Sequence, residues 1–218
     1  MSQFETLRAP GAGAATRRNA DVARSRAKRG VDIAVAVTAL SVLAPALLLI
    51  MALIWLEDRS PVIFRQRRTG LDGRTFPILK FRTMRVAECG ADVRQATRGD
   101  TRVTRVGAIL RALSLDELPQ LMNVLRGEMS LVGPRPHALA HDEAWAQLAP
   151  AYRRRFRTRP GLTGLAAVEG HRGEVTSVEE ILRRIEADNV YIDNWSLQLD
   201  LKILWRTVPL MFRDPNAY

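Results

Sequence analysis

Two adjacent carboxylates, Asp116 and Glu117, lie in the stretch L-S-L-D-E-L-P-Q, residues 113 to 120, of a 218-residue chain. Apolar neighbours indicate an enclosed position for these acids, in a chain whose formal net charge is +10. A carboxylate can attack phosphorus and form an aspartyl phosphate. Two approaching anions need positive charge from Mg²⁺ and arginines, and a neighbouring carboxylate is a natural Mg²⁺ ligand. One acid could therefore attack while the other holds the metal.

The same stretch also has a purely structural interpretation. Ser114 and Glu117 fit a capping box, with the serine as N-cap and the glutamate at the third helical position. Acids in a first turn complement the helix dipole. This interpretation predicts a helix over residues 114–125, although Pro119 indicates that the helix begins close to that residue.

Arginines around the pair favour the chemical interpretation. Arg105 and Arg111 precede it, while Arg135 in G-P-R-P and Arg159 in R-P-G are bracketed or followed by proline. Proline stiffens the backbone and lowers the entropy cost of holding a guanidinium, which can bind phosphate through two parallel hydrogen bonds. The alternative for each is a surface salt bridge in a turn. The excess of Lys and Arg over Asp and Glu, 33 against 23, favours nucleic acid, anionic lipid or phosphorylated substrates as partners.

A single apolar segment places this chemistry at a membrane. Residues 33–56 are 24 residues without a charge, and a bilayer-spanning helix needs roughly 20. Both flanks are basic, with six Lys or Arg residues over 17–29 and five over 59–74, so the positive-inside rule assigns both to the cytoplasm. Pro45 kinks the middle of the segment. The pattern favours a re-entrant hairpin over a tilted span with a tolerated proline.

The remaining chain predicts a mostly helical α+β fold. Extended stretches on both sides of G-L-D-G, residues 70–73, predict a β-hairpin, and helices are expected over 103–113 and 178–191. The tail from Trp195 is amphipathic, and it either lies on the membrane with Trp195 and Trp205 at the interface or packs in the core. We expect three parts: a flexible basic arm over 1–27, a re-entrant membrane helix over 28–58, and a catalytic domain with interfacial helices over 59–218.

The sequence lacks the residue patterns of disulfides, of common metal sites and of the phosphate-binding loop. One cysteine, Cys89, excludes an internal disulfide and a cysteine-based zinc site. His137 and His141 have a spacing that could bind a metal on a helix, but no third ligand accompanies them, so we interpret them as surface histidines. The phosphate-binding pattern G-x-x-x-x-G-K-[ST] is absent from the sequence.

Taken in order, several motifs resemble one family. They are K-R-G-V-D before the apolar segment, K-F-R-T-M, L-S-L-D-E-L-P-Q-L-M-N-V-L-R-G-E-M-S-L-V-G-P-R-P, R-P-G-L-T-G and Y-I-D-N-W-S-L-Q-L-D-L-K-I-L. Over residues 28 to 210 the chain closely resembles the bacterial sugar transferases of the monotopic phosphoglycosyl transferase family. The resemblance implies transfer of a sugar 1-phosphate from a nucleotide diphosphate sugar to polyprenyl phosphate, releasing a nucleoside monophosphate and initiating exopolysaccharide or glycan assembly.

The resemblance also implies roles for particular residues. Asp116 would be the nucleophile that holds a covalent phospho-sugar, Glu117 would bind Mg²⁺, and Pro45 would break the re-entrant helix. Three arginines would bind phosphate or nucleotide: Arg111, Arg135 and Arg159. The implied location is the cytoplasmic face of the bacterial inner membrane, in contact with its lipids and without nucleic acid, and a homodimer is left open.

The sequence departs from the family at two places. Ala44 precedes the central proline where a serine is frequent, so the bend depends more on Pro45 and on packing. Leu165, Ala166 and Ala167 follow R-P-G-L-T-G where Trp and Gln are frequent, so nucleotide or sugar contacts near residues 165–172 should differ. The short form and the D-P-N-A-Y ending resemble small exopolysaccharide-initiating members, which indicates a UDP-hexose substrate, galactose or glucose.

Two rival hypotheses remain at this point. Polyprenyl phosphate could attack the nucleotide sugar directly, with Asp116 as a base and no covalent intermediate. Alternatively, the chain could be a non-enzymatic, membrane-anchored basic module, because Lys and Arg beside a membrane segment attract anionic lipids at about 1 kcal/mol each.

Overall fold

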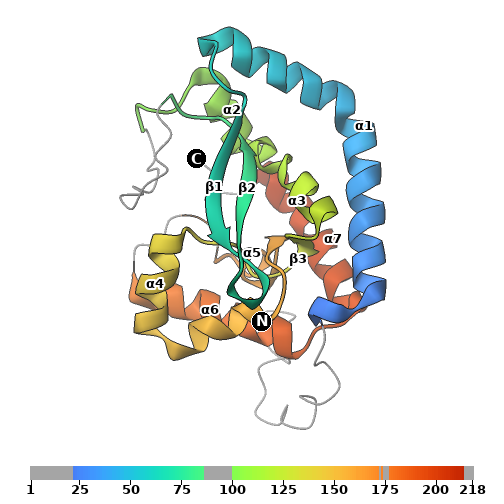
Figure 1. Cartoon of the computed structure of the whole chain (residues 1–218), viewed down its shortest axis with the longest axis vertical. Helices are drawn as coiled ribbons and strands as arrows, with labels where there is room; N and C mark the ends of the chain where they lie inside the picture. Colours follow the sequence, from blue (N-terminus) through green and yellow to red (C-terminus); the bar gives the residue numbers. More distant parts are fainter. Residues whose placement is uncertain (1–21, 86–99, 172, 174–176, 214–218) are drawn as a thin grey trace.

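The computed structural model describes residues 22–85, 100–171, 173 and 177–213 (Figure 1). Most of the predicted basic arm, the lone Cys89 and the D-P-N-A-Y ending lie outside these ranges. Helices dominate and strands are few, so the predicted α+β, mostly helical fold is confirmed. The division into three parts stays a prediction.

The apolar segment forms one long helix, α1 (Arg26–Asp58), which contains Pro45. Ser25 caps its start by accepting a hydrogen bond from the backbone N–H of Lys28 at 3.3 Å, and Arg59 ends it in the left-handed conformation. Figure 1 shows the two halves of α1 running in different directions, as expected for a helix with an internal proline. Within the described residues, α1 is the one helix long and apolar enough to cross a membrane.

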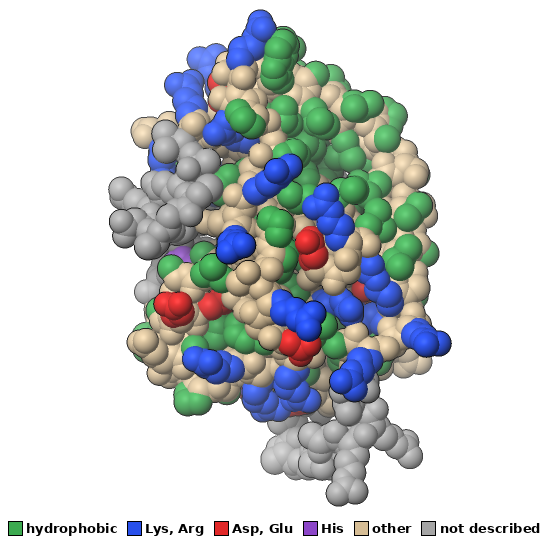
Figure 2. All heavy atoms as spheres, viewed as in Figure 1, with side chains coloured by type: hydrophobic (Ala, Val, Ile, Leu, Met, Phe, Trp, Pro, Cys, Tyr) green, Lys and Arg blue, Asp and Glu red, His purple; other side chains and the backbone are tan. Residues whose placement is uncertain are grey.

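One side of α1 is uncovered over most of its length. Figure 2 shows apolar side chains gathered where this helix runs, while Lys and Arg dominate the lower half of the same face. The exposed large apolar residues of α1 are Val31, Ile33, Val35, Val37, Val42, Leu48, Leu49, Met51, Leu53, Trp55 and Leu56. Exposed apolar side chains gathered on one helix in this way mark contact with a membrane or with another protein.

Both ends of α1 are attached to the rest of the fold. Near its start, buried Lys28 forms an ion pair with Asp200 of the last helix, at 2.6 Å. Near its end, the Glu57 carboxylate accepts hydrogen bonds from the backbone N–H groups of Arg105 and Val106, at 2.8 and 3.2 Å. These acceptors satisfy donors that the start of helix α2 (Arg105–Ala112) leaves without an intrahelical partner.

The predicted hairpin is confirmed. Strands β1 (Ile63–Thr69) and β2 (Thr75–Phe81) pair antiparallel, from Ile63 opposite Phe81 to Thr69 opposite Thr75. The strands are connected by the short helix η4 (Leu71–Gly73), in which φ is positive at Asp72 and Gly73, 55° and 75°. Glycine adopts positive φ most readily, and asparagine and aspartate do so more readily than other residues.

A second, parallel pair of strands joins two proline-containing loops. Strand β3 (Ser130–Val132) pairs with β4 (Gly161–Thr163). The Gly161 N–H also donates to the Pro134 carbonyl at 2.9 Å, so the loop 133–136 lies next to the turn at 159–161. A Cβ atom on Gly161 would lie 2.1 Å from the backbone nitrogen of Gly133. Only glycine permits this backbone approach.

The remaining helices pack around these strands. A main core forms between α1, β2, α3 (Gln120–Arg126), β3, the short α5 (Leu165–Val168), α6 (Val178–Asp193) and α7 (Leu197–Arg213). A smaller core joins α6 to α4 (Leu139–Leu148) and to the 3₁₀ segment η6 (Pro150–Arg157). Figure 1 shows α4 and α6 together at the end of the molecule away from α2.

The tail packs in the core along one side and leaves another side exposed. Leu199 and Ile203 of α7 are buried, whereas Trp205 is 80% exposed. Trp195 is partly buried against the main core and donates its indole N–H to Asp200 at 3.1 Å. Contact of Trp195 and Trp205 with a membrane interface stays a prediction.

Candidate active site

The acid pair does not lie in a regular helix. After α2 the chain turns at Ser114, which has a left-handed φ of 55°, and Asp116 and Glu117 sit in the 3₁₀ segment η5 (Leu115–Glu117). Ser114 makes no side-chain capping bond, so the capping-box interpretation is wrong. The regular helix α3 begins at Gln120, directly after Pro119, as the proline indicated.

Glu117 is held by two cations from different elements. Its Oε1 accepts from Lys80 Nζ at 2.8 Å and from Arg135 Nη2 at 2.5 Å, and its Oε2 accepts from Arg135 Nη1 at 3.2 Å. Only 8% of Glu117 is exposed. Burial alone would raise the pKa of Glu117, but the charges of Arg135 and Lys80 outweigh it and hold this pKa well below its usual range.

Asp116 has the opposite electrostatic environment. Its carboxylate lies 4.0 Å from Lys80 Nζ, beyond direct hydrogen-bond distance. Burial raises the pKa of Asp116, and the neighbouring negative charge of Glu117 adds to the rise, against weaker opposing effects of Lys80, Arg111 and Arg135. The two acids are thus electrostatically distinct: the anionic form of Glu117 is stabilised by its two cations, and the anionic form of Asp116 is less stabilised.

Lys80 is a site residue that the spacing arguments missed. It lies in β2, within the K-F-R-T-M motif, and Asn123 of α3 fixes that strand beside the acid pair. The buried Asn123 side chain accepts from the Leu79 N–H at 3.0 Å and donates to the Pro77 carbonyl at 2.8 Å. A lysine inside the apolar run I-L-K-F was the available signal, because strands seldom bury a lysine without a partner.

The three arginines expected at the site are placed differently. Arg135 contacts Glu117, and the charge of Arg111, in the last turn of α2, acts on Asp116. Arg159 instead donates to the backbone carbonyls of Gly127 and Ala23, at 2.8 and 2.6 Å. The structure therefore brings Arg111 and Arg135 to the acid pair but does not bring Arg159 there.

The two histidines contribute ring packing. His137 and His141 lie 4.4 and 5.8 Å from Trp145, between ring centroids. In the described part of the chain, no group of three or more His, Cys, Asp or Glu side chains is placed to hold a metal ion. His137 is also partly buried, so the description of it as a surface residue is incomplete.

Comparison with known proteins identifies the family. A family model for bacterial sugar transferases matches residues 23–214, which is most of the chain. The chain belongs to the bacterial sugar transferase family. The resemblance inferred from the motifs is confirmed.

Several relatives of this sugar transferase are similar over most of its length. The UDP-glucose:undecaprenyl-phosphate glucose-1-phosphate transferase of Caulobacter vibrioides is 56% identical over 191 residues, 88% of this chain and 72% of that protein. A protein of the same name from Escherichia coli strain K12 is 47% identical over 88% of this chain, but the match covers 41% of that protein. The exopolysaccharide production protein PSS of Rhizobium leguminosarum bv. phaseoli is 44% identical over 83% of this chain and 92% of that protein.

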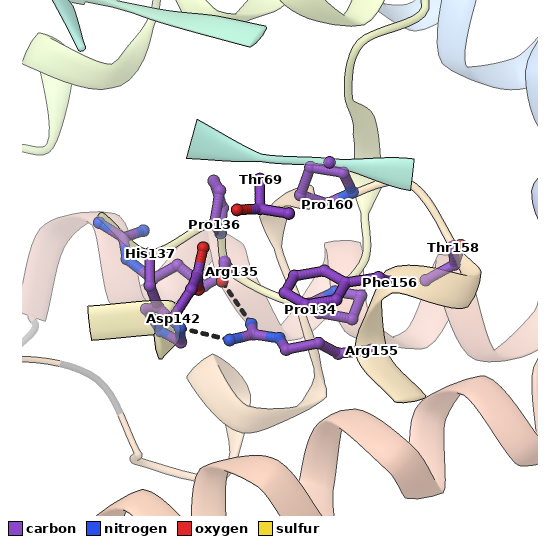
Figure 3. A pocket seen from close by; sticks show the side chains of 11 residues that line it. Thr69, Pro134, Arg135, Pro136, His137, Asp142, Arg155, Phe156, Thr158 and Pro160 are labelled. Carbon is purple, nitrogen blue, oxygen red and sulfur yellow. Dashed lines mark hydrogen bonds between the residues drawn. The ribbon is translucent and has the colours of Figure 1, made fainter. Parts of the chain in front are cut away.

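In this sugar transferase a buried cation supports the loop that carries Arg135. Arg155 of η6 is 5% exposed and forms an ion pair with Asp188 of α6 at 3.0 Å. It donates to the Tyr152 hydroxyl at 2.8 Å and to the backbone carbonyl of Arg135. Figure 3 shows Arg155 reaching from η6 toward the loop of Pro134, Arg135 and Pro136. Arg155 is therefore a positioning residue for the cation that holds Glu117.

Proposed function

We propose that the protein transfers a sugar 1-phosphate from a UDP-sugar to undecaprenyl phosphate and so initiates exopolysaccharide or glycan assembly. The observation that carries this proposal is the unequal acid pair: Glu117 is hydrogen-bonded to Arg135 and Lys80, while the Asp116 side chain beside it is 14% exposed and lies 4.0 Å from Lys80 Nζ. The relatives' names supply the substrates, and UDP-glucose in these names favours glucose over galactose as the sugar. The match covers only part of several relatives, so activity, substrates and partners are all included in the proposal.

The covalent route assigns the attack to Asp116. A carboxylate oxygen of Asp116 forms a bond to the phosphorus that carries the sugar, and the bond from that phosphorus to the bridging oxygen breaks, releasing UMP. An oxygen of polyprenyl phosphate then attacks the same phosphorus, and the Asp116 carboxylate leaves. The products are UMP and a polyprenyl-diphosphate sugar, and Asp116 is regenerated.

Cations around the pair counter the negative charge of both steps. Lys80 Nζ lies 4.0 Å from Asp116 and 2.8 Å from Glu117. The positive charge of Arg111 lowers the pKa of Asp116, and Arg135 forms an ion pair with Glu117 at 2.5 Å. Phosphoryl transfer is accelerated mainly by positioning and by such fixed positive charge.

Mg²⁺ fits the donor set of the site. Glu117 is ionised and adjacent to a second carboxylate, and Mg²⁺ is commonly bound by one or two carboxylates together with substrate phosphates. In the proposal Glu117 would hold the ion, which would supply positive charge beside the phosphates. Arg135 and Lys80 occupy both Glu117 oxygens in this structure, so they compete with the ion and keep the carboxylate ionised.

The test of the overall proposal is release of UMP from a panel of UDP-sugars, with undecaprenyl phosphate and Mg²⁺ supplied. We expect release with UDP-glucose that depends on the lipid acceptor in multiple-turnover conditions. A protein that binds anionic vesicles but releases no UMP from any sugar of the panel would instead be the non-enzymatic lipid-binding module.

Mass spectrometry separates the covalent route from direct attack of polyprenyl phosphate. After exposure to UDP-sugar without the lipid acceptor, the peptide that contains residues 113–120 should gain the mass of a sugar phosphate. Direct attack predicts no adduct on this peptide, even when quenching is fast.

The acid side of the pH–rate profile follows from the Asp116 environment. Because burial raises the pKa of Asp116 and attack needs the deprotonated form, kcat/KM should fall on acidification at a pH above the usual carboxylate range. Lys80→Met removes the cation that most lowers the Asp116 pKa, so it should move this fall to higher pH. A profile that is unchanged in Lys80→Met would contradict the assigned electrostatics.

A monotopic, re-entrant position on the cytoplasmic face of the bacterial inner membrane completes the proposal. Both ends of α1 contact the same folded body, through Lys28 and Asp200 at one end and Glu57 and the start of α2 at the other. A straight span would separate these ends by the thickness of the bilayer. Assembly as a homodimer stays a prediction.

Cysteine labelling tests this topology. In a Cys89→Ser background, Ala27→Cys and Ser60→Cys place one thiol near each end of α1. We expect a membrane-impermeant maleimide to label both thiols in inside-out vesicles and neither in intact spheroplasts. Labelling of one of the two in spheroplasts would show a spanning helix.

A further inference from the structure

Arg135 also lines a hollow that the acid pair does not line, and the hollow together with the open space at its mouth measures about 390 Å³. The hollow lies between the β4–α5 segment and α6, with Leu162, Ala166 and Ala167 as apolar lining. Arg184 of α6 and Thr163 supply hydrogen-bonding groups. A concave, largely apolar space with a few converging polar groups is the usual form of a small-molecule site.

Arg184 is the group in the hollow that lacks a full set of partners. It is 9% exposed, and its Nη2 donates to the Gly173 carbonyl at 2.8 Å. Its Nε is buried and has no hydrogen-bond partner among the described residues. A buried donor without a partner is costly in the folded protein, so an acceptor from a ligand would be favourable there.

The charges around the hollow favour an anion. Arg135 and Arg184 line the same hollow, so two positive charges face one space. Burial lowers the pKa of Arg184, and the positive charge of Arg135 lowers it further. Asp188 also lines the hollow, but its carboxylate is paired with Arg155 at 3.0 Å. A phosphate between Arg135 and Arg184 would relieve the repulsion and accept the unused hydrogen bond.

The lining beside this cationic end is made of small residues. Ala166 and Ala167 leave an apolar surface where longer side chains would fill the hollow. Gly164 cannot carry a side chain there, because a Cβ would lie 2.3 Å from the Gly133 carbonyl oxygen. The hollow thus combines a place for a phosphate with an apolar surface for a ring.

We propose that Arg184 and Arg135 bind the phosphate that leaves with the nucleoside, and that the nucleoside lies against Ala166 and Ala167. This inference rests on the proposed function and deepens it. Arg135 would then join the two halves of the donor: the sugar phosphate at Asp116 and the nucleoside monophosphate in the hollow. Selectivity for the nucleotide would come from α5 and α6, separately from the acid pair.

Binding of UMP to the full-length protein in detergent micelles tests the inference without turnover. Arg184→Gln should raise the Kd for UMP about tenfold or more, since it removes a charge-assisted contact. Ala167→Trp fills the hollow without touching Arg184, and it should weaken UMP binding to a similar extent. In steady-state assays both variants should raise KM for the UDP-sugar and leave KM for undecaprenyl phosphate unchanged.

Arg183→Gln is the matched control, since Arg183 is the neighbouring arginine on α6 and forms an exposed ion pair with Glu179. It should bind UMP like the parent. Parental UMP affinity in both Arg184→Gln and Ala167→Trp would overturn the inference while leaving the transfer reaction intact. Absence of UMP release by the parent from every UDP-sugar would overturn the proposed function itself, so the two failures are distinguishable.

Discussion

Replacing Asp116 with asparagine is expected to lower the rate of UMP release by about 10³-fold or more, as removal of a nucleophile does in other covalent enzymes. Asparagine keeps the size of the side chain but cannot form the phosphoryl bond. The sugar-phosphate adduct on the peptide of residues 113–120 should disappear at the same time. UMP release and the peptide mass measure the two effects independently.

The same substitution should not destabilise the fold. Because burial raises the pKa of Asp116, the folded state binds the Asp116 proton more tightly than the unfolded state does. This contribution favours the folded state at low pH and is lost as the pH rises through the raised pKa. Near pH 7 the ionised carboxylate is therefore a cost, and Asp116→Asn should leave the Tm unchanged or raise it.

Asp193→Asn is the control for this prediction. Asp193 is a carboxylate of α6 that pairs with Arg154 at 2.7 Å and Arg157 at 3.4 Å, both half-exposed. Its loss should leave UMP release close to the parental rate. Parental activity in Asp116→Asn, or an adduct that persists on its 113–120 peptide, would show that another group is the nucleophile.

The sequence predicted those features that depend on local pattern. The turn G-L-D-G between two extended runs was enough to place the β1–β2 hairpin, because its residues suit positive φ and its flanks suit strands. Pro119 located the start of α3 for a similar reason. The length and apolar character of α1 were equally clear.

Features that depend on contacts between distant segments were not predictable in this way. Lys80 lies 37 residues before Glu117, and the packing of α3 against β2, with Asn123 bonded to that strand, brings the two together. Arg159 shares with Arg135 the arginine–proline pattern that suggested phosphate binding, yet its guanidinium binds the carbonyls of Gly127 and Ala23. A stiff backbone restricts the conformation of an arginine, but its hydrogen-bond partners depend on the tertiary fold.

The acid pair shows the same limit within a single motif. Ser114 and Glu117 have the spacing of a capping box, and spacing cannot report that Ser114 takes a left-handed φ. The Glu117 carboxylate accepts hydrogen bonds from Lys80 and Arg135 instead of from a backbone N–H group at the helix start. The stronger, charge-assisted contacts thus replace the local capping bond.

The largest stability effect is expected at the buried ion pair that fixes the start of α1. Lys28 donates to Asp200 at 2.6 Å and to the Val132 carbonyl at 3.0 Å, and Tyr191 donates to Asp200 at 2.8 Å. Asp200→Leu would leave the Lys28 ammonium buried without its counter-charge, which typically costs about 3–5 kcal/mol. The free energy of unfolding, from denaturant titration of detergent-solubilised protein, measures this loss.

The double variant Lys28→Met with Asp200→Leu distinguishes charge from packing. Removing both charges should be less destabilising than the sum of the single variants, because no buried charge is then left alone. Asp193→Leu, which breaks the exposed pair with Arg154, should cost only about 0–1 kcal/mol. A loss of that small size in Asp200→Leu would contradict the role of this pair in holding α1 to α7.

Activity should fall together with this stability, even under conditions where the variant is still folded. Val132 directly precedes the loop 133–136, and Lys28 is bonded to its carbonyl. Loosening that contact frees the start of the loop that holds Arg135 against Glu117. UMP release by folded Asp200→Leu at its parental rate would show that Arg155 and Asp188 alone keep the loop in place.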